Sequence, residues 1–98
     1  MTIGMSIPPW EGRRRADALR FVKRKGAAES APCVICRQPI DYTLRHPHLS
    51  SCSVQHLKSQ RDFPQLRWDP ANWGPAHLGC NVSEGARPTT DLGLMSDD

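Results

Sequence analysis

Large apolar side chains are scarce in this chain. Of its 98 residues only 38% are hydrophobic and 6% are aromatic, whereas it contains 7 glycines and 9 prolines. A chain of this length and composition has no room for a second core, so we expect a single domain. Because a core this thin seldom holds a short chain together by itself, we also expect a cross-link, either a bound metal ion or disulfide bonds.

Two kinds of segment are missing. No stretch approaches the roughly 20 apolar residues of a membrane span, and residues 1–10 lack the basic region and apolar run of a secretory signal. We therefore expect no contact with a membrane and a reducing, cytoplasmic location. In that compartment cysteines at metal-ligand spacing favour a metal ion, with two disulfides as the alternative.

Four residues with metal-binding side chains form two pairs, each separated by two residues. Cys33 and Cys36 make a C-x-x-C pair, and His77 and Cys80 make an H-x-x-C pair. Tight turns at this spacing aim both side chains at one point, and three thiolates with one imidazole suit tetrahedral zinc. We predict a structural Zn²⁺ held by these four residues. Cys52 has no partner at this spacing; it is either a substitute for His77 or, as we favour, a small buried thiol.

Positive charge is concentrated in one segment. The net charge of the chain is only +3, but residues 13–25 contain a single acid, Asp17. The basic residues of this segment are Arg13, Arg14, Arg15, Arg20, Lys23, Arg24 and Lys25. A concentrated basic surface attracts phosphate, and we favour this role over the alternative of a solvated helix face.

The same segment has the spacing of a helix. Ala16, Leu19 and Val22 form an apolar stripe, with Phe21 as a further candidate, and Gly26 is a stop signal. We predict a basic helix over residues 10–26. Residues 1–9 end in two prolines and are expected to be a flexible arm, and the polar, acidic residues 88–98 a disordered tail.

Two short strands and a helix are predicted downstream. Residues 53–57 alternate polar and apolar side chains, as a half-buried strand does, and residues 72–76 are predicted to be the returning strand. A short helix is expected from about residue 80 to residue 84. The connection over residues 58–70 is long for a compact domain, which is typical of functional or mobile loops. These elements predict an α+β fold.

Further histidines and tryptophans lie outside the zinc pairs. An isolated histidine such as His56, in the middle of a predicted strand, is by itself more often structural than catalytic. His46 and His48 are expected to be exposed loop residues rather than phosphate ligands. Trp68 and Trp73 are expected to cover the core rather than to stack on bases.

Three segments resemble the motifs of one enzyme family, the HNH (His-Me finger) endonucleases. V-Q-H-L at 54–57 resembles the first motif, D-P-A-N-W at 69–73 the middle one, and A-H-L-G-C-N-V-S-E-G at 76–85 the last. The last block is similar to that of small phage and actinobacterial members, where it reads A-H-x-x-C-N. The resemblance implies a zinc-stabilised ββα-metal domain over residues 33–87, with the basic helix before it.

The resemblance also implies a function, the metal-assisted hydrolysis of DNA phosphodiester bonds. His56 would be the general base that deprotonates the attacking water, and Asn72 would orient it through a hydrogen bond. Gln55 and Asn81 would bind the catalytic Mg²⁺ or Mn²⁺, which places Asn81 among the catalytic residues as well.

The chain departs from the family pattern at the two positions that would bind this cation. Members normally carry Asp at position 55 and often His at position 81, whereas this chain has Gln55 and Asn81. Amide oxygens bind hard cations without contributing charge, so we expect a lower metal affinity. Asp62 or Asp69 in the connecting loop is a candidate for the missing carboxylate.

Two other functions are compatible with the same residues. A cleavage-deficient, zinc-dependent DNA-binding module explains the uncharged Gln55 and Asn81. A zinc-ribbon adaptor for protein interactions explains the zinc pairs but gives His56 and Asn72 no role. DNA is the expected partner in the nuclease and the binding module, and the sequence identifies no protein partner.

Overall fold

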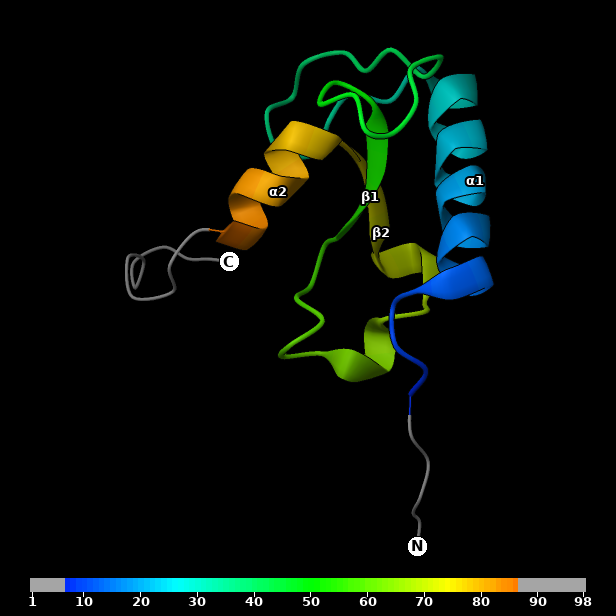
Figure 1. The fold of residues 1–98 in the computed structure, drawn as a ribbon, viewed down its shortest axis with the longest axis vertical. Coiled ribbons are helices and arrows are strands. Elements are labelled where there is room, and N and C mark those ends of the chain that lie inside the picture. The colour runs from blue at the N-terminus through cyan, green and yellow to red at the C-terminus, as the bar shows by residue number, and fades with distance from the viewer. Residues whose placement is uncertain (1–6, 87–98) are drawn as a thin grey trace, which may run out of the picture.

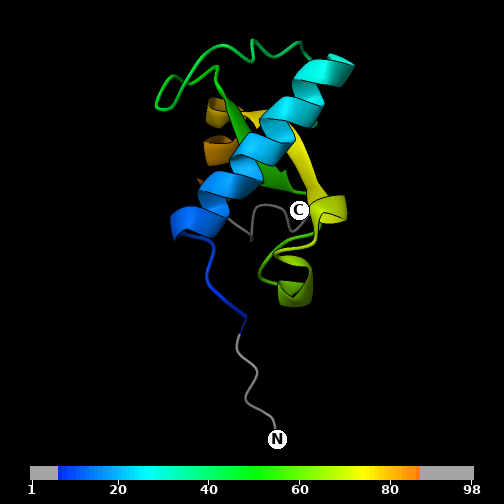
Figure 2. The ribbon, with the colours of Figure 1, turned by 90° about the vertical axis from the view of Figure 1, so that its right-hand side faces the viewer.

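The computed structural model describes residues 7–86, which form an α+β fold. Helix α1 (Gly12–Glu29) precedes an antiparallel hairpin of β1 (Cys52–His56) and β2 (Trp73–His77), and α2 (Leu78–Ala86) follows directly. The two helices lie on opposite sides of the hairpin (Figures 1 and 2). Two short 3-10 helices, η1 (Pro64–Leu66) and η2 (Pro70–Asn72), lie in the connection between the strands. The predicted α+β class is confirmed.

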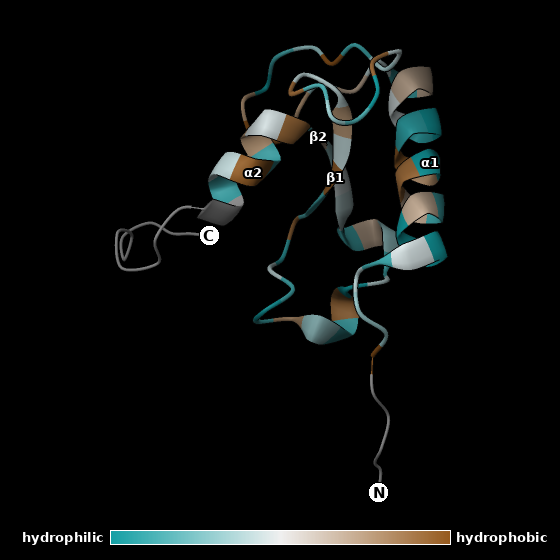
Figure 3. Cartoon of the chain, in the orientation of Figure 1, coloured by the Kyte–Doolittle hydropathy of each residue, from teal (hydrophilic) through white to brown (hydrophobic). Residues whose placement is uncertain are grey.

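Helix α1 packs on the hairpin through a stripe of small residues. Ala18, Val22 and Gly26 are buried at a spacing of four residues, which places them on one face of a helix. Ala16, predicted to belong to this stripe, is exposed, and its place is taken by Ala18. Hydrophilic and hydrophobic bands alternate along α1 (Figure 3). The helix is therefore amphipathic, as predicted, but its buried face is rotated from the expected one.

Gly26 does not end α1, contrary to the prediction. The helix continues to Glu29, and Ser30 ends it in the left-handed conformation (φ 51°), while the Ala31 N–H donates to the Gly26 carbonyl over 2.9 Å. The glycine serves another purpose, because a Cβ atom at this position would lie 2.5 Å from the Tyr42 hydroxyl. It allows the Tyr42 ring to lie directly on the helix.

The hairpin register places the residues of the predicted motifs. Cys52 is opposite His77, and His56 is opposite Trp73. Each strand is one residue away from its predicted bounds of 53–57 and 72–76, within the usual uncertainty of strand ends. The outer edge of β2 is covered by the first cysteine pair, because the Val34 N–H donates to the Pro75 carbonyl over 2.9 Å. Pro75 has no N–H to donate, and its nitrogen faces the same outer edge. The proline therefore removes no hydrogen bond between β1 and β2.

A small core lies between α1, the hairpin and the first cysteine pair. Its buried members are Val22, Cys33, Ile40, Cys52 and Ala76. Partly buried residues, among them Tyr42, Val54 and Trp73, pack around them. Since one of the predicted zinc ligands, Cys33, is a member of this core, a metal ion bound there would also stabilise the packing of the core.

Residues 7–9, expected to belong to a flexible arm, contact the connection between the strands. The Arg67 guanidinium donates to the carbonyls of Ile7 (3.4 Å) and Pro8 (3.0 Å), and the Trp68 indole N–H donates to Pro8 over 2.8 Å. The rest of the arm and the tail over 88–98 lie outside the described residues, so those predictions stay open. No helix within residues 7–86 is long and apolar enough to cross a membrane.

Candidate metal centre and active-site cleft

The four predicted zinc ligands lie together. Their ligand atoms are all within 4.8 Å of one another, and His77 Nδ1 lies 3.3 Å from Cys36 Sγ and 3.8 Å from Cys80 Sγ. In a tetrahedral zinc site with these ligands, neighbouring donor atoms are about 3.5 to 3.8 Å apart. The cluster is therefore compatible with a structural zinc ion.

Local structure delivers each ligand to the cluster. Cys33 and Cys36 belong to a tight turn, in which the Arg37 N–H donates to the Cys33 carbonyl over 2.9 Å with Arg37 in a left-handed conformation (φ 67°). His77 is the last residue of β2 and Cys80 lies in the first turn of α2. The junction between strand and helix thus aims the second pair at the first.

The surroundings of Cys33 and Cys80 shift the pKa values of the two thiols in opposite directions. Burial disfavours the Cys33 thiolate, but the backbone N–H groups of Cys36, His77 and Ile35 outweigh it and lower the pKa of Cys33 to about 6. For Cys80, burial and the neighbouring sulfur atoms raise the pKa to about 11. A bound cation would relieve this repulsion, because it attracts every thiolate of the set.

His77 is oriented for binding through one particular nitrogen. Its Nε2 lies 3.0 Å from the Pro39 carbonyl. A carbonyl only accepts, so Nε2 carries the proton and Nδ1 presents a lone pair to the sulfur atoms. Cys52, the alternative ligand, is a core thiol that lies outside the cluster. Burial raises its pKa to about 11, as expected for a buried thiol.

A cleft of about 960 Å³ follows β1 between α1 and α2. Residues of the first and last predicted motifs border it together, namely Gln55, His56 and Asn81. Three charged residues border it from different elements: Arg15 of α1, Arg61 of the loop after β1, and Glu84 of α2. His46, predicted to be an exposed loop residue, is exposed and also borders the cleft, whereas His48 is exposed elsewhere.

His56 is held as a neutral imidazole. Its Nε2 lies 2.9 Å from the Arg67 carbonyl, which can only accept, so Nδ1 is left with a free lone pair. Burial lowers the pKa of His56 below its ordinary value of 6.5, and the Arg67 charge adds to this, while the hydrogen bond acts in the opposite direction. At neutral pH the ring is a base rather than a cation.

The Asn72 side chain forms its hydrogen bonds with Lys58 and Leu66 and none with His56, contrary to the prediction. Its side-chain oxygen accepts from the Lys58 N–H over 2.8 Å, and its amide donates to the carbonyls of Lys58 (3.1 Å) and Leu66 (3.4 Å). The register explains the difference, because Trp73 is opposite His56 and Asn72 lies one step further. Asn72 is buried and holds the loop; the Arg67 carbonyl orients the imidazole.

The side-chain amides of Gln55 and Asn81 have different surroundings. Gln55 Oε1 is buried and accepts no hydrogen bond. The Asn81 amide nitrogen donates to Ser53 Oγ (3.1 Å) and the Val54 carbonyl (2.8 Å), which turns it toward β1. Hard cations bind amide oxygen atoms of this chemical kind.

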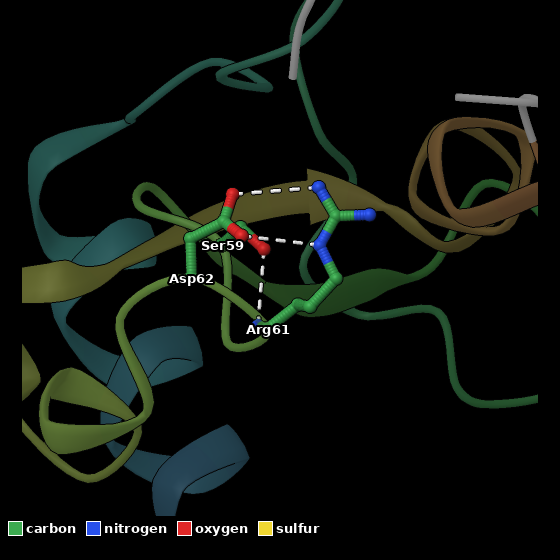
Figure 4. A network of polar contacts seen from close by, with 3 residues as sticks. All are labelled: Ser59, Arg61 and Asp62. Atoms are coloured by element: carbon green, nitrogen blue, oxygen red, sulfur yellow. Dashed lines mark hydrogen bonds and ion pairs between the residues drawn. The ribbon is translucent and has the colours of Figure 1, made fainter. Parts of the chain in front are cut away.

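The two carboxylates suggested for this site are engaged elsewhere. Asp62 forms an ion pair with Arg61, over 3.1 and 3.4 Å, beside Ser59 (Figure 4). Asp69 caps η2 by accepting from the Ala71 N–H over 3.0 Å. Among the described residues that border the cleft, only Glu84 carries a carboxylate. Sequence reasoning missed it, although its position three residues after Asn81 places both on one face of α2.

Sequence reasoning also missed Trp10. Its ring meets the His56 ring edge to face, with centroids 4.4 Å apart and an interplanar angle of 81°. The rings of Trp68 and Trp73 lie beside it, with centroids 4.5 and 5.7 Å from that of Trp10, and Trp73 packs on the core as predicted.

Comparisons of the chain with family models, curated proteins and solved structures gave no match.

Proposed function

We propose that the protein is a metal-dependent DNA endonuclease of the HNH type. One observation carries the proposal: His56, with an unprotonated Nδ1, borders the same cleft as the oxygen-bearing side chains of Gln55 and Asn81. The order of the elements supports it, because an antiparallel hairpin followed by a helix is the arrangement that the motifs imply. The Cys33, Cys36, His77 and Cys80 cluster would hold the structural zinc.

His56 is the general base in this proposal. Its Nδ1 takes a proton from water as the water attacks the phosphorus atom. The Arg67 carbonyl accepts from Nε2 throughout and stabilises the imidazolium that forms. Asn72 contributes indirectly, since its bonds to Lys58 and Leu66 fix the loop that carries Arg67.

Gln55 and Asn81 would hold a divalent cation through their side-chain oxygens. When bound, Mg²⁺ or Mn²⁺ supplies positive charge that neutralises the scissile phosphate and the leaving oxygen. The Glu84 carboxylate contributes negative charge to the same cleft, where position 55 contributes none. With two neutral ligands, the protein is expected to need a higher cation concentration than a site with Asp at position 55.

Helix α1 would bind the DNA backbone. Arg13, Arg14 and Arg15 are exposed in its first turns, and Arg15 also borders the cleft. Phosphates bound along α1 would therefore continue toward His56. A second candidate function, a DNA-binding module without cleavage, is favoured by the uncharged side chains at positions 55 and 81.

Nicking of supercoiled plasmid in a panel of divalent ions tests the proposal. His56→Ala should lower the nicking rate by roughly 10²- to 10⁴-fold, the usual effect of losing a positioned base, with zinc content and DNA affinity unchanged. His48→Ala is the matched control, because this exposed histidine lies away from the cleft. Gln55→Asp should lower the cation concentration needed for half-maximal rate.

The pattern of results separates the candidates. Cleavage by Gln55→Asp but not by the wild type would favour the binding module, and a lack of cleavage by both, with zinc bound, would refute the nuclease.

The nicking rate should depend on pH through the protonation of His56. Because the base must be unprotonated and its pKa lies below 6.5, the rate should be constant above neutral pH and fall as the pH drops through that pKa.

A further inference from the structure

The segment over residues 7–10 is built into the candidate active site. It precedes α1 and runs beside the connection that contains η1 and η2 (Figure 1). Three hydrogen bonds from Arg67 and Trp68 hold its backbone carbonyls. These contacts join residues nearly 60 positions apart in the chain, and they place Trp10 against the end of β1.

Arg67 links this segment to His56 through two parts of the same residue. Its guanidinium donates to the carbonyls of Ile7 and Pro8. Its own carbonyl lies 2.9 Å from His56 Nε2 and accepts from the Trp73 indole over 2.9 Å. A shift of the N-terminal segment would therefore move the atom that orients the imidazole.

The Trp10 ring packs directly against the imidazole of His56. It stands edge to face against His56 and is backed by the rings of Trp68 and Trp73. An aromatic pair in this geometry stabilises the placement of both rings beyond the effect of burial alone. Gly12 makes the placement possible, because its positive φ of 70° lets the chain turn between the segment and α1.

We propose that Trp10 is a positioning residue for His56, and that the N-terminal segment thereby completes the active site. It touches neither DNA nor cation in this proposal; it keeps the imidazole bonded to the Arg67 carbonyl, with Nδ1 facing the cleft. The catalytic part of the inference rests on the nuclease function proposed above. The positioning of His56 does not, and can be measured by itself.

The experiment compares three variants of the full chain with the wild type. Trp10→Ala removes the ring, Trp10→Phe keeps an aromatic edge, and Phe63→Ala is the control. Phe63 lies in the same connection but packs against Lys58, 5.3 Å from its ammonium group, and does not border the cleft. Each variant is checked for zinc content and melting temperature; should Trp10→Ala not fold, Trp10→Leu takes its place.

The first measurement is independent of catalysis. An imidazole N–H is seen in NMR spectra only when a hydrogen bond and burial protect it from exchange with water. At fixed pH the His56 Nε2–H signal should be present in the wild type, Trp10→Phe and Phe63→Ala, and lost in Trp10→Ala. A protected signal in Trp10→Ala would overturn the inference, even if the protein proved to be no nuclease.

The second measurement is the nicking rate at saturating DNA, together with DNA affinity. Misplacing a catalytic group by about 1 Å can lower a rate roughly 10²-fold, so Trp10→Ala should lower the nicking rate about 10- to 100-fold while its Kd for DNA stays within about twofold of wild type. Trp10→Phe should recover most of the rate. An unchanged rate, or a loss confined to affinity, would overturn the catalytic part.

Discussion

Cys33 and Cys52 are both buried in the same core, yet their surroundings shift the pKa values of the two thiols in opposite directions. Three backbone N–H groups point at the Cys33 sulfur, over 3.4, 3.4 and 3.5 Å, and overcome the effect of burial on its pKa. At Cys52, burial outweighs the charge of Lys23 and a backbone hydrogen bond from Ala76, and it raises the pKa to about 11. Backbone hydrogen bonds, and not burial alone, therefore decide the acidity of these two thiols.

Cys80 belongs to the cluster of candidate zinc ligands and Cys52 does not, so their substitutions should have contrasting effects. Cys80→Ser removes a ligand, and because zinc binding contributes on the order of 10 kcal/mol to such small domains, the protein should lose zinc and largely unfold. Cys52→Ala removes only a packed sulfur and should cost about 1–2 kcal/mol with zinc content unchanged. Elemental analysis and thermal melting check both. Loss of zinc from Cys52→Ala, or an unchanged melting curve for Cys80→Ser, would contradict the assignment of ligands.

At the scale of elements, α1 packs on the hairpin through small residues rather than through large apolar side chains. Its buried residues are only Ala18, Val22 and Gly26, so the helix lies close to the hairpin. Tyr42 then packs on Gly26 and donates from its hydroxyl to the Ala31 carbonyl over 2.7 Å. This contact joins the end of α1 to the loop that follows the first cysteine pair.

Gly26→Ala should therefore destabilise the protein, although alanine favours helices over glycine by about 1 kcal/mol. The added methyl group displaces the Tyr42 ring and breaks its hydrogen bond, at a net cost of about 1–3 kcal/mol. Urea denaturation measures the change in free energy of unfolding. As a control, Gly26→Ala in a Tyr42→Ala background should be neutral or stabilising; an equal loss in both backgrounds would mean that the ring is not the cause.

At the scale of the whole molecule, basic side chains border the cleft that lies between the two helices. The basic helix and α2 flank the hairpin on opposite sides (Figure 2), and the cleft between them is bordered by Arg15 and Arg61. Asp17 and Glu29 pair with Arg20 and Lys25, while Arg13 and Arg15 belong to no ion pair within the described residues. The first turns of α1 therefore carry the charge best placed for phosphate.

Removing this charge should weaken DNA binding for all sequences alike. Arg13→Gln/Arg15→Gln should lower the affinity and make the slope of log K against log salt shallower by roughly 1–2, since each phosphate contact contributes about 0.9. Arg37→Gln/Arg45→Gln is the matched control, with the same loss of charge at exposed positions away from α1 and the cleft. Equal effects of the two double variants would show a non-specific charge effect and argue against α1 as the DNA-binding element.

Local sequence patterns were sufficient to predict the four candidate zinc ligands and the helices and strands. Two pairs with fixed spacing predicted the cluster of Cys33, Cys36, His77 and Cys80, because short turns bring such residues together whatever the rest of the chain does. The alternation at 53–57 and the helical pattern of the basic segment likewise depend on near neighbours. The α+β class and the buried role of Cys52 followed from the same kind of evidence.

Only the tertiary structure decided how distant segments meet. The role of Asn72 depends on a register in which Trp73, not Asn72, is opposite His56. Gly26 has the sequence signature of a helix end, and only the Tyr42 ring shows why it lies within one. Trp10 reaches His56 because Arg67 and Trp68 bind the segment before it. Such contacts arise from packing between residues far apart in the chain, which no local pattern encodes.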